Sequence, residues 1–204
     1  MKKLSEHYGI KFLRFGFFVL LCFVIKAAIA DVAFASKAVS SGDTLGKTFV
    51  VIDKNAADLK IYDPSGRLIA VTPVLLGYAK GDFSAPGIGS KLIKDIAPHE
   101  KTTPAGRFVS EPGVNLNGES IVWIDYDSSV SMHRLRASNR SEKRVERMST
   151  ATPSDNRITY GCINVPEAFY DKWIAPSFGR TPAIIYVLPE MHSPKDFFKF
   201  LNYP

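Results

Sequence analysis

The sequence of 204 residues predicts a single, mostly β domain. Short apolar runs recur along the chain, and turn residues such as Pro64-Ser65-Gly66 separate them, which is the pattern of strands joined by turns. Hydrophobic residues make up 46% of the chain. The roughly 170 residues beyond the N-terminal segment can therefore bury one core without the help of disulfide bonds.

Two strands open the predicted domain, at residues 47–53 and 59–62, and the short connection between them predicts a hairpin. A third, strongly apolar strand at 68–76 ends at Gly77. Residues 78–98 are rich in Gly, Ser and Pro and predict a long loop, a kind of segment that is often functional. A tight turn at 102–108 enters another strand, and the later predicted strands are 120–127, 129–135 and 181–188.

Helical signals occur in two places. Residues 136–155 are polar and charged, with weak helical character around 141–148, and we expect an excursion from the core there. Pro166 suits the first turn of a helix, and apolar residues follow it at helical spacing, so a short helix is predicted over 166–174.

The N-terminal residues 1–30 have the layout of a secretory signal peptide. Four basic residues precede the apolar run 15–25, and Ala28-Ile29-Ala30 supplies small residues for cleavage. That run is shorter than the ~20 residues that a membrane-spanning helix needs, which favours cleavage over an uncleaved membrane anchor. We therefore expect an exported protein of the periplasm or cell envelope, with a short linker at 31–46, the main folded domain at 47–190 and an aromatic C-terminal tail at 191–204 docked on its surface.

The charge of the chain argues against a nucleic-acid partner. There are 26 basic and 20 acidic residues in all, but residues 1–30 hold five of the basic and one of the acidic ones. The remainder has 21 basic and 19 acidic residues, so the excess of positive charge belongs largely to the export segment.

Cys162 is the only cysteine left once Cys22 departs with the signal peptide. A lone thiol in an exported protein favours a nucleophile over half of a disulfide. His133 is the one histidine within a strand pattern near it, and an imidazole that takes the thiol proton raises the reactive fraction. Backbone N–H groups at Gly161 and Cys162 could hold an oxyanion. Together these residues predict cysteine acyl transfer.

Other interpretations of the same residues stay open at this point. A lone cysteine is commonly a small buried hydrophobe, and a single strand histidine is often a packed, hydrogen-bonded residue. A zinc site would need paired ligand spacing, which the scattered His residues do not supply, so no metal and no cofactor is predicted.

A resemblance to a known family favours catalysis. The segment 48–188 resembles the catalytic domain of L,D-transpeptidases, the YkuD-type enzymes of peptidoglycan cross-linking. The landmarks that match in order are the hairpin 49–63, the strand ending in Gly77, the run Thr103-Pro104-Ala105-Gly106-Arg107-Phe108, His133, and Thr159-x-Gly161-Cys162-Ile163-Asn164. The family motif has Ser/Thr-His-Gly-Cys-hydrophobic-Asn, so all but one of its fixed positions are present. The resemblance implies a β-sandwich with a short helix after the cysteine.

The resemblance also implies roles. Cys162 would attack a tetrapeptide stem of peptidoglycan, with His133 as general base, oriented by a neighbouring backbone carbonyl such as that of Arg134. The acyl group would pass to an amine, giving a 3-3 cross-link; with water as acceptor the site would be a hydrolase, a carboxypeptidase or an amidase. Thr159 and Asn164 would shape the loop rather than react. A catalytically silent wall-binding module is the third alternative.

Two departures from the family pattern bear on substrate preference. Tyr160 stands where the family has histidine, so a phenol must do whatever that side chain does. The 25 residues between His133 and Thr159 exceed the usual spacer, which identifies the charged segment 136–155 as an insertion. We expect this segment to form part of a cleft wall or a lid, with arginines such as Arg134 and those that follow it binding stem carboxylates.

Overall fold

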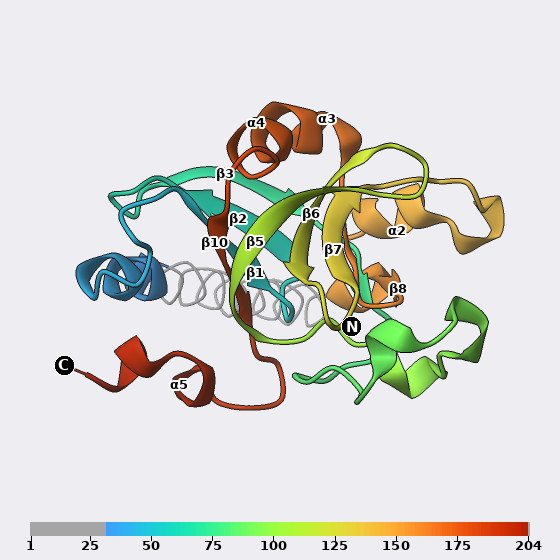
Figure 1. Ribbon diagram of the computed structural model, residues 1–204, viewed down its shortest axis with the longest axis horizontal. Coiled ribbons are helices and arrows are strands. Elements are labelled where there is room, and N and C mark those ends of the chain that lie inside the picture. Colours follow the sequence, from blue (N-terminus) through green and yellow to red (C-terminus); the bar gives the residue numbers. More distant parts are fainter. Residues whose placement is uncertain (1–31, 204) are drawn as a thin grey trace, which may run out of the picture.

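The computed structural model describes residues 32–203 and is built mainly of strands (Figure 1). The predicted signal peptide lies outside these residues. Eight strands form one sheet in the order β3-β2-β1-β10-β5-β6-β7-β9, and β4 and β8 form a second, two-stranded sheet. Their bounds are β1 Phe49–Asp53, β2 Asp58–Tyr62, β3 Leu68–Pro73, β4 Leu76–Gly77, β5 Gly106–Val114, β6 Ser120–Asp125, β7 Val130–Arg134, β8 Arg157–Thr159, β9 Ile163–Val165 and β10 Ala183–Leu188. The mostly β fold class is confirmed.

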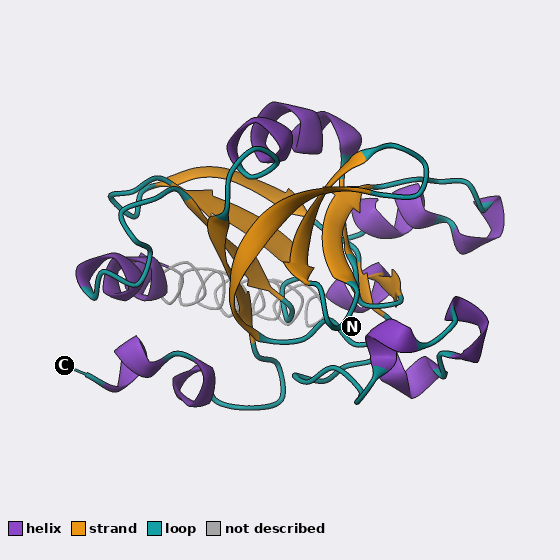
Figure 2. Ribbon diagram, in the orientation of Figure 1, coloured by secondary structure: helices purple, strands orange, loops and turns teal. Residues whose placement is uncertain are grey.

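One long strand turns the large sheet into two facing layers. The first half of β5 pairs with β10, and its second half, from Glu111 to Val114, pairs with β6. A strand that passes from one layer to the next in this way makes a corner of a sandwich. Side chains of β1, β2 and β10 therefore meet those of β6, β7 and β9 in a single buried cluster, and the strongly curved sheet is visible in Figure 2.

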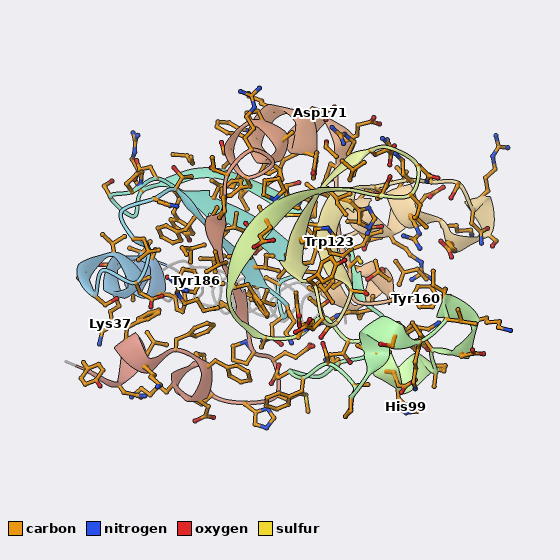
Figure 3. The ribbon with its side chains drawn as sticks, viewed as in Figure 1. Lys37, His99, Trp123, Tyr160, Asp171 and Tyr186 are labelled. Atoms are coloured by element: carbon orange, nitrogen blue, oxygen red, sulfur yellow. The ribbon has the colours of Figure 1, made fainter. Side chains whose placement is uncertain are left out.

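The central strands β1 and β10 are buried on both faces. Val50 and Ile52 belong to the main core, whereas Phe49 and Val51, which point the other way, belong to a second apolar cluster. Burial on both faces explains why these strands are continuously apolar instead of alternating. Tyr186 of β10 lies on the second face, between residues 32–40 and the C-terminal segment (Figure 3).

This second cluster contains residues of the segment predicted as a linker and of the segment predicted as a docked tail. Residues 32–40 are helical, and their Phe34, Ala35 and Ala38 are buried against the sheet. The C-terminal segment, with α5 at Pro194–Phe197, contributes Phe198, which packs edge-on against Phe34 at 5.1 Å between ring centroids. The second face of β1 and β10 is apolar, and residues 32–40 together with the C-terminal segment cover it.

The predicted third strand is two strands in the structure. Proline has no N–H to donate to a ladder, and β3 ends at Pro73 on the edge of the large sheet. The N–H of Val74 then bonds to the carbonyl of Ala57, and the chain turns into β4, which pairs with β8. This turn brings Gly77 close to the segment that leads to Cys162.

The helical elements are short and lie outside the sheet (Figure 2). The predicted helix after the cysteine runs further than expected: α3 Glu167–Phe169, a π-helical turn Tyr170–Ile174 and α4 Ala175–Ser177 follow one another and bury Tyr170 and Ile174 in the main core. The charged segment contains α2 at Arg144–Ser149, flanked by short 3-10 turns. Three further 3-10 turns occupy the second half of the long loop, between residues 88 and 100. Across residues 32–203, no helix has the length and apolarity to cross a membrane.

Candidate active site

Cys162 and His133 are brought together by the pairing of two neighbouring strands. Strands β7 and β9 run parallel, with His133 opposite Asn164 and Met132 opposite Ile163. Cys162 directly precedes β9, so its side chain lies beside the last residues of β7. The strand pairing therefore joins two residues that are 29 positions apart in the sequence.

The thiol of Cys162 is surrounded by polar groups of β7 and of the turn before it. Its Sγ atom lies 3.6 Å from the Ser131 hydroxyl oxygen and 3.6 Å from the carbonyl oxygen of Ser129. Burial would raise the pKa of this thiol, but the hydrogen bond to His133, the positive charge of that imidazole and bonds from Ser131 together hold the pKa below its ordinary value. The thiolate is thus more available than that of a free cysteine.

His133 is held by a carbonyl on one side of its ring. Its Nδ1 atom lies 2.9 Å from the carbonyl oxygen of Arg134, the orienting group that the sequence suggested. A carbonyl can only accept, so Nδ1 carries a proton and Nε2 is the nitrogen that can receive one. Burial would lower the pKa of His133, but the hydrogen bond to Cys162, the charge of the thiolate and the bond to Arg134 raise it above its usual range.

The turn at Gly161 directs a backbone N–H away from the protein interior. Gly161 has a φ of +132°, and a Cβ added to it would sit 2.8 Å from the carbonyl oxygen of Thr102. The Thr103 hydroxyl donates to the Gly161 carbonyl at 2.8 Å. In a trans peptide unit the C=O and the following N–H point in opposite directions, so the Cys162 N–H faces outward. It has no hydrogen-bond partner among residues 32–203.

Of the two N–H groups expected to hold an oxyanion, those of Gly161 and Cys162, only the second is free to do so in the part of the chain that the structure describes. The N–H of Gly161 donates to the Thr159 hydroxyl oxygen at 3.2 Å, and that hydroxyl donates in turn to the Cys162 carbonyl at 2.6 Å. Thr159 thereby closes the turn on itself and occupies the Gly161 donor. The Cys162 N–H remains the group that can stabilise an oxyanion.

Replacing Thr103 with valine should slow acylation of Cys162 about 10-fold to 100-fold, because the Gly161 peptide loses the bond that aims the Cys162 N–H. Acylation by a carbapenem, followed by mass spectrometry over time, measures the rate. Thr72→Val is the matched control, since the buried Thr72 hydroxyl also bonds to a backbone carbonyl, that of Pro73, but in β3. Equal rates for wild type and Thr103→Val would remove Thr103 from the site.

Tyr160 lies on the exposed side of this turn, with 42% of its surface accessible. The ammonium of Lys101 sits 4.0 Å from the centre of its ring, within the range of a cation–π contact. Figure 3 shows Tyr160 beside the segment that carries His99. The phenol therefore forms part of the rim of the site, together with the end of the long loop.

A cavity of about 320 Å³ lies between the long loop and the β6–β7 hairpin. Its walls are Gly89 and Ser90 from the long loop and Trp123, Tyr126, Asp127 and Ser129 from the β6–β7 hairpin. Ser129 connects this cavity to the nucleophile, because it lines the cavity and its carbonyl oxygen lies 3.6 Å from Cys162 Sγ. The predicted functional loop at 78–98 thus contributes to the site through its second half.

Two arginines of the charged segment are engaged within the protein. Arg136 pairs with Glu119 and Glu167, and Arg147 donates to the backbone carbonyls of Glu142 and Asp155. These bonds fasten the segment to the domain and leave the two guanidinium groups little freedom to hold stem carboxylates.

The Arg134 side chain is also directed away from the thiol. It forms an ion pair with Asp171 at 2.7 Å and lies over the ring of Tyr170, on the helical segment after β9. Its carbonyl, not its guanidinium, belongs to the site. Sequence reasoning missed Thr103, Ser131 and Arg144, whose contacts with the site depend on the tertiary fold. Among residues 32–203, no group of His, Cys, Asp and Glu side chains could hold a metal ion.

Comparison with known proteins gives structural similarity alone. No protein-family model and no curated protein matches the sequence. The fold is similar to the catalytic domain of the L,D-transpeptidase of E. faecium, at 17% identity and a TM-score of 0.41, over 70% of this chain and 98% of that one. It is similar to the helical cell shape determining protein Pgp2 of Campylobacter jejuni, at 14% identity and a TM-score of 0.47, over 72% and 49% of the two chains.

The L,D-transpeptidase of Mycobacterium smegmatis is similar at 18% identity and a TM-score of 0.40, over 69% of this chain and 58% of that one. The present chain thus spans about half to three fifths of the two longer structures.

Proposed function

We propose that the protein is an exported cysteine acyltransferase of peptidoglycan, an L,D-transpeptidase. The observation that carries the proposal is the Cys162 thiol, whose pKa is lowered by His133, beside its own unoccupied and outward-facing N–H. A polarised nucleophile, a base and an oxyanion donor within one turn and one strand are the parts that acyl transfer requires.

The first half-reaction forms a thioester. The Cys162 sulfur attacks the carbonyl that links the L-centre of the third residue to the terminal D-Ala of a tetrapeptide stem, while His133 Nε2 takes the thiol proton. The Cys162 N–H stabilises the negative oxygen that results. The C–N bond then breaks, and the imidazolium gives its proton to the D-Ala amine as it leaves.

The second half-reaction releases the acyl group to an amine of a neighbouring stem. The amine attacks the thioester carbonyl, its proton passes to His133, and the thiolate leaves, so that a 3-3 cross-link forms and the enzyme is restored. We assign the stem peptide to the cavity lined by Trp123, Tyr126 and Asp127, because Ser129 borders both this cavity and the thiol.

A hydrolase is the second candidate, favoured by the partial exposure of the residue Cys162, which leaves room for water to approach the thioester. The products separate the two activities. Purified protein incubated with disaccharide-tetrapeptide should release D-Ala and yield 3-3 dimers, measured by chromatography and mass spectrometry. Tripeptide without dimer would identify a carboxypeptidase, and unchanged substrate together with no carbapenem adduct would leave only a wall-binding module.

A further inference from the structure

A short line of hydrogen bonds connects the charged segment 136–155 to the base. The Arg144 guanidinium, in α2, donates from Nη1 to the Asn164 side-chain oxygen at 2.6 Å. The Asn164 amide nitrogen lies 3.2 Å from His133 Nε2. On the other side of the ring, Nδ1 is held by the Arg134 carbonyl at 2.9 Å. The line therefore ends on the nitrogen that must take the thiol proton.

Arg144 decides which way the Asn164 amide points. A guanidinium has donors only, so the atom that faces it must be the amide oxygen. The amide N–H groups then face His133 Nε2, and Asn164 itself is fixed because it is buried within β9. Without Arg144 the amide could rotate by half a turn and present its oxygen to the ring, which would favour a proton on Nε2.

We propose that Arg144 is a positioning residue, which acts through Asn164 to weaken the hold of His133 Nε2 on a proton. The inference rests on the proposed function and deepens it, since it assigns the inserted segment a part in the proton transfer of that site. Arg144 touches neither the thiol nor the cavity wall, so it is not itself a catalytic residue.

The charge of Arg144 acts in the same direction as the amide. The charged groups around the His133 ring are the Cys162 thiolate, which raises the histidine pKa, and Arg144, which lowers it. Arg134, next along β7, is neutralised by Asp171, and Arg144 is itself paired with Glu142. Loss of the cation and rotation of the amide would both stabilise the imidazolium. We therefore expect the pKa of His133 to rise when Arg144 is removed.

The test compares Arg144→Met with Arg144→Lys and with Arg147→Met. Arg147 lies in the same helix and holds the same segment through two backbone carbonyls, yet it has no contact with Asn164. Two readouts are taken as a function of pH: the rate of Cys162 acylation by a carbapenem, and the ring-nitrogen chemical shifts of His133 by NMR. Thermal unfolding shows which variants remain folded.

We expect the acid limb of the acylation profile, and the His133 titration, to move up by roughly 0.5 to 1 pH unit in Arg144→Met. Arg144→Lys, which keeps the charge and loses the planar fork, should move them less, and Arg147→Met should not move them. Superimposable profiles for wild type and Arg144→Met, or an equal shift in Arg147→Met, would overturn the inference. If the wild type forms no carbapenem adduct, the proposed function fails. The His133 titration in the Arg144 variants still decides whether Arg144 acts on His133.

Discussion

Replacing Cys162 with alanine should abolish acylation, because no other residue described at the site offers a nucleophile with a lowered pKa. A carbapenem should add its mass to the wild-type protein and leave Cys162→Ala unchanged. Release of D-Ala from a tetrapeptide stem should disappear with it. Single removal of a nucleophile that works as part of a unit commonly costs about 10⁶ in rate, which places the variant below detection in both measurements.

Cys162→Ser is the matched control for this loss. It keeps a polar side chain between Ser131 and the Ser129 carbonyl, so the fold and the local hydrogen bonds are retained. A serine hydroxyl has no lowered pKa of the kind that makes the thiolate reactive, and we expect at most a trace of its activity. Adduct formation by Cys162→Ala, or identical wall fragments in cells that express wild type or this variant, would show that the thiol is not the nucleophile.

The strands that could be predicted from sequence are those whose pattern is local. Residues 49–53 and 58–62 have strongly apolar runs and a short connection, and they form the expected hairpin. The apolar run at 183–188 forms β10, and its pairing between β1 and β5 follows from tertiary arrangement alone. The division of the third predicted strand at Pro73 could have been anticipated from the missing proline donor.

Residues 32–40 were expected to be part of a linker because their packing partner is far away in sequence. Phe34, Ala35 and Ala38 have the spacing of one helical face, a signal that the small and polar neighbours obscured. That helical face packs against Phe198, which lies more than 160 residues later in the chain and on the same side of β10. A contact between residues so far apart has no signature in the local sequence, so the sequence of this packed helix resembled that of a linker.

Some residues of the candidate site could be predicted from sequence, and others are recognised only in the fold. The Cys162 motif and His133 stand out as residue types, and the β7–β9 register explains their meeting. Thr103 contacts the site through a hydrogen bond to the Gly161 carbonyl, and Arg144 through one to the Asn164 amide, and those bonds exist only in the folded chain. An arginine in a charged run is indistinguishable by sequence from its neighbours, although Arg144 alone among them reaches Asn164.

Replacing His133 with alanine should slow acylation of Cys162 by roughly 10² to 10⁴-fold at neutral pH, the usual contribution of a general base. The imidazole lowers the thiol pKa through a hydrogen bond and through charge, while burial acts in the opposite direction. Its removal leaves the effect of burial, so the thiol pKa should rise and the thiolate fraction should fall.

The pH dependence separates this role from a structural one. Alkylation of Cys162 by iodoacetamide reports the thiolate alone; the rate for His133→Ala should lie well below wild type near pH 7 and approach it as the pH rises past the new thiol pKa. His99→Ala is the control, because His99 is an exposed histidine of the long loop. A uniform loss at every pH would indicate a damaged fold, and an unchanged profile would mean that His133 does not activate the thiol. The predicted result, a loss confined to neutral and acid pH, follows from the proton that the imidazole shares with Cys162.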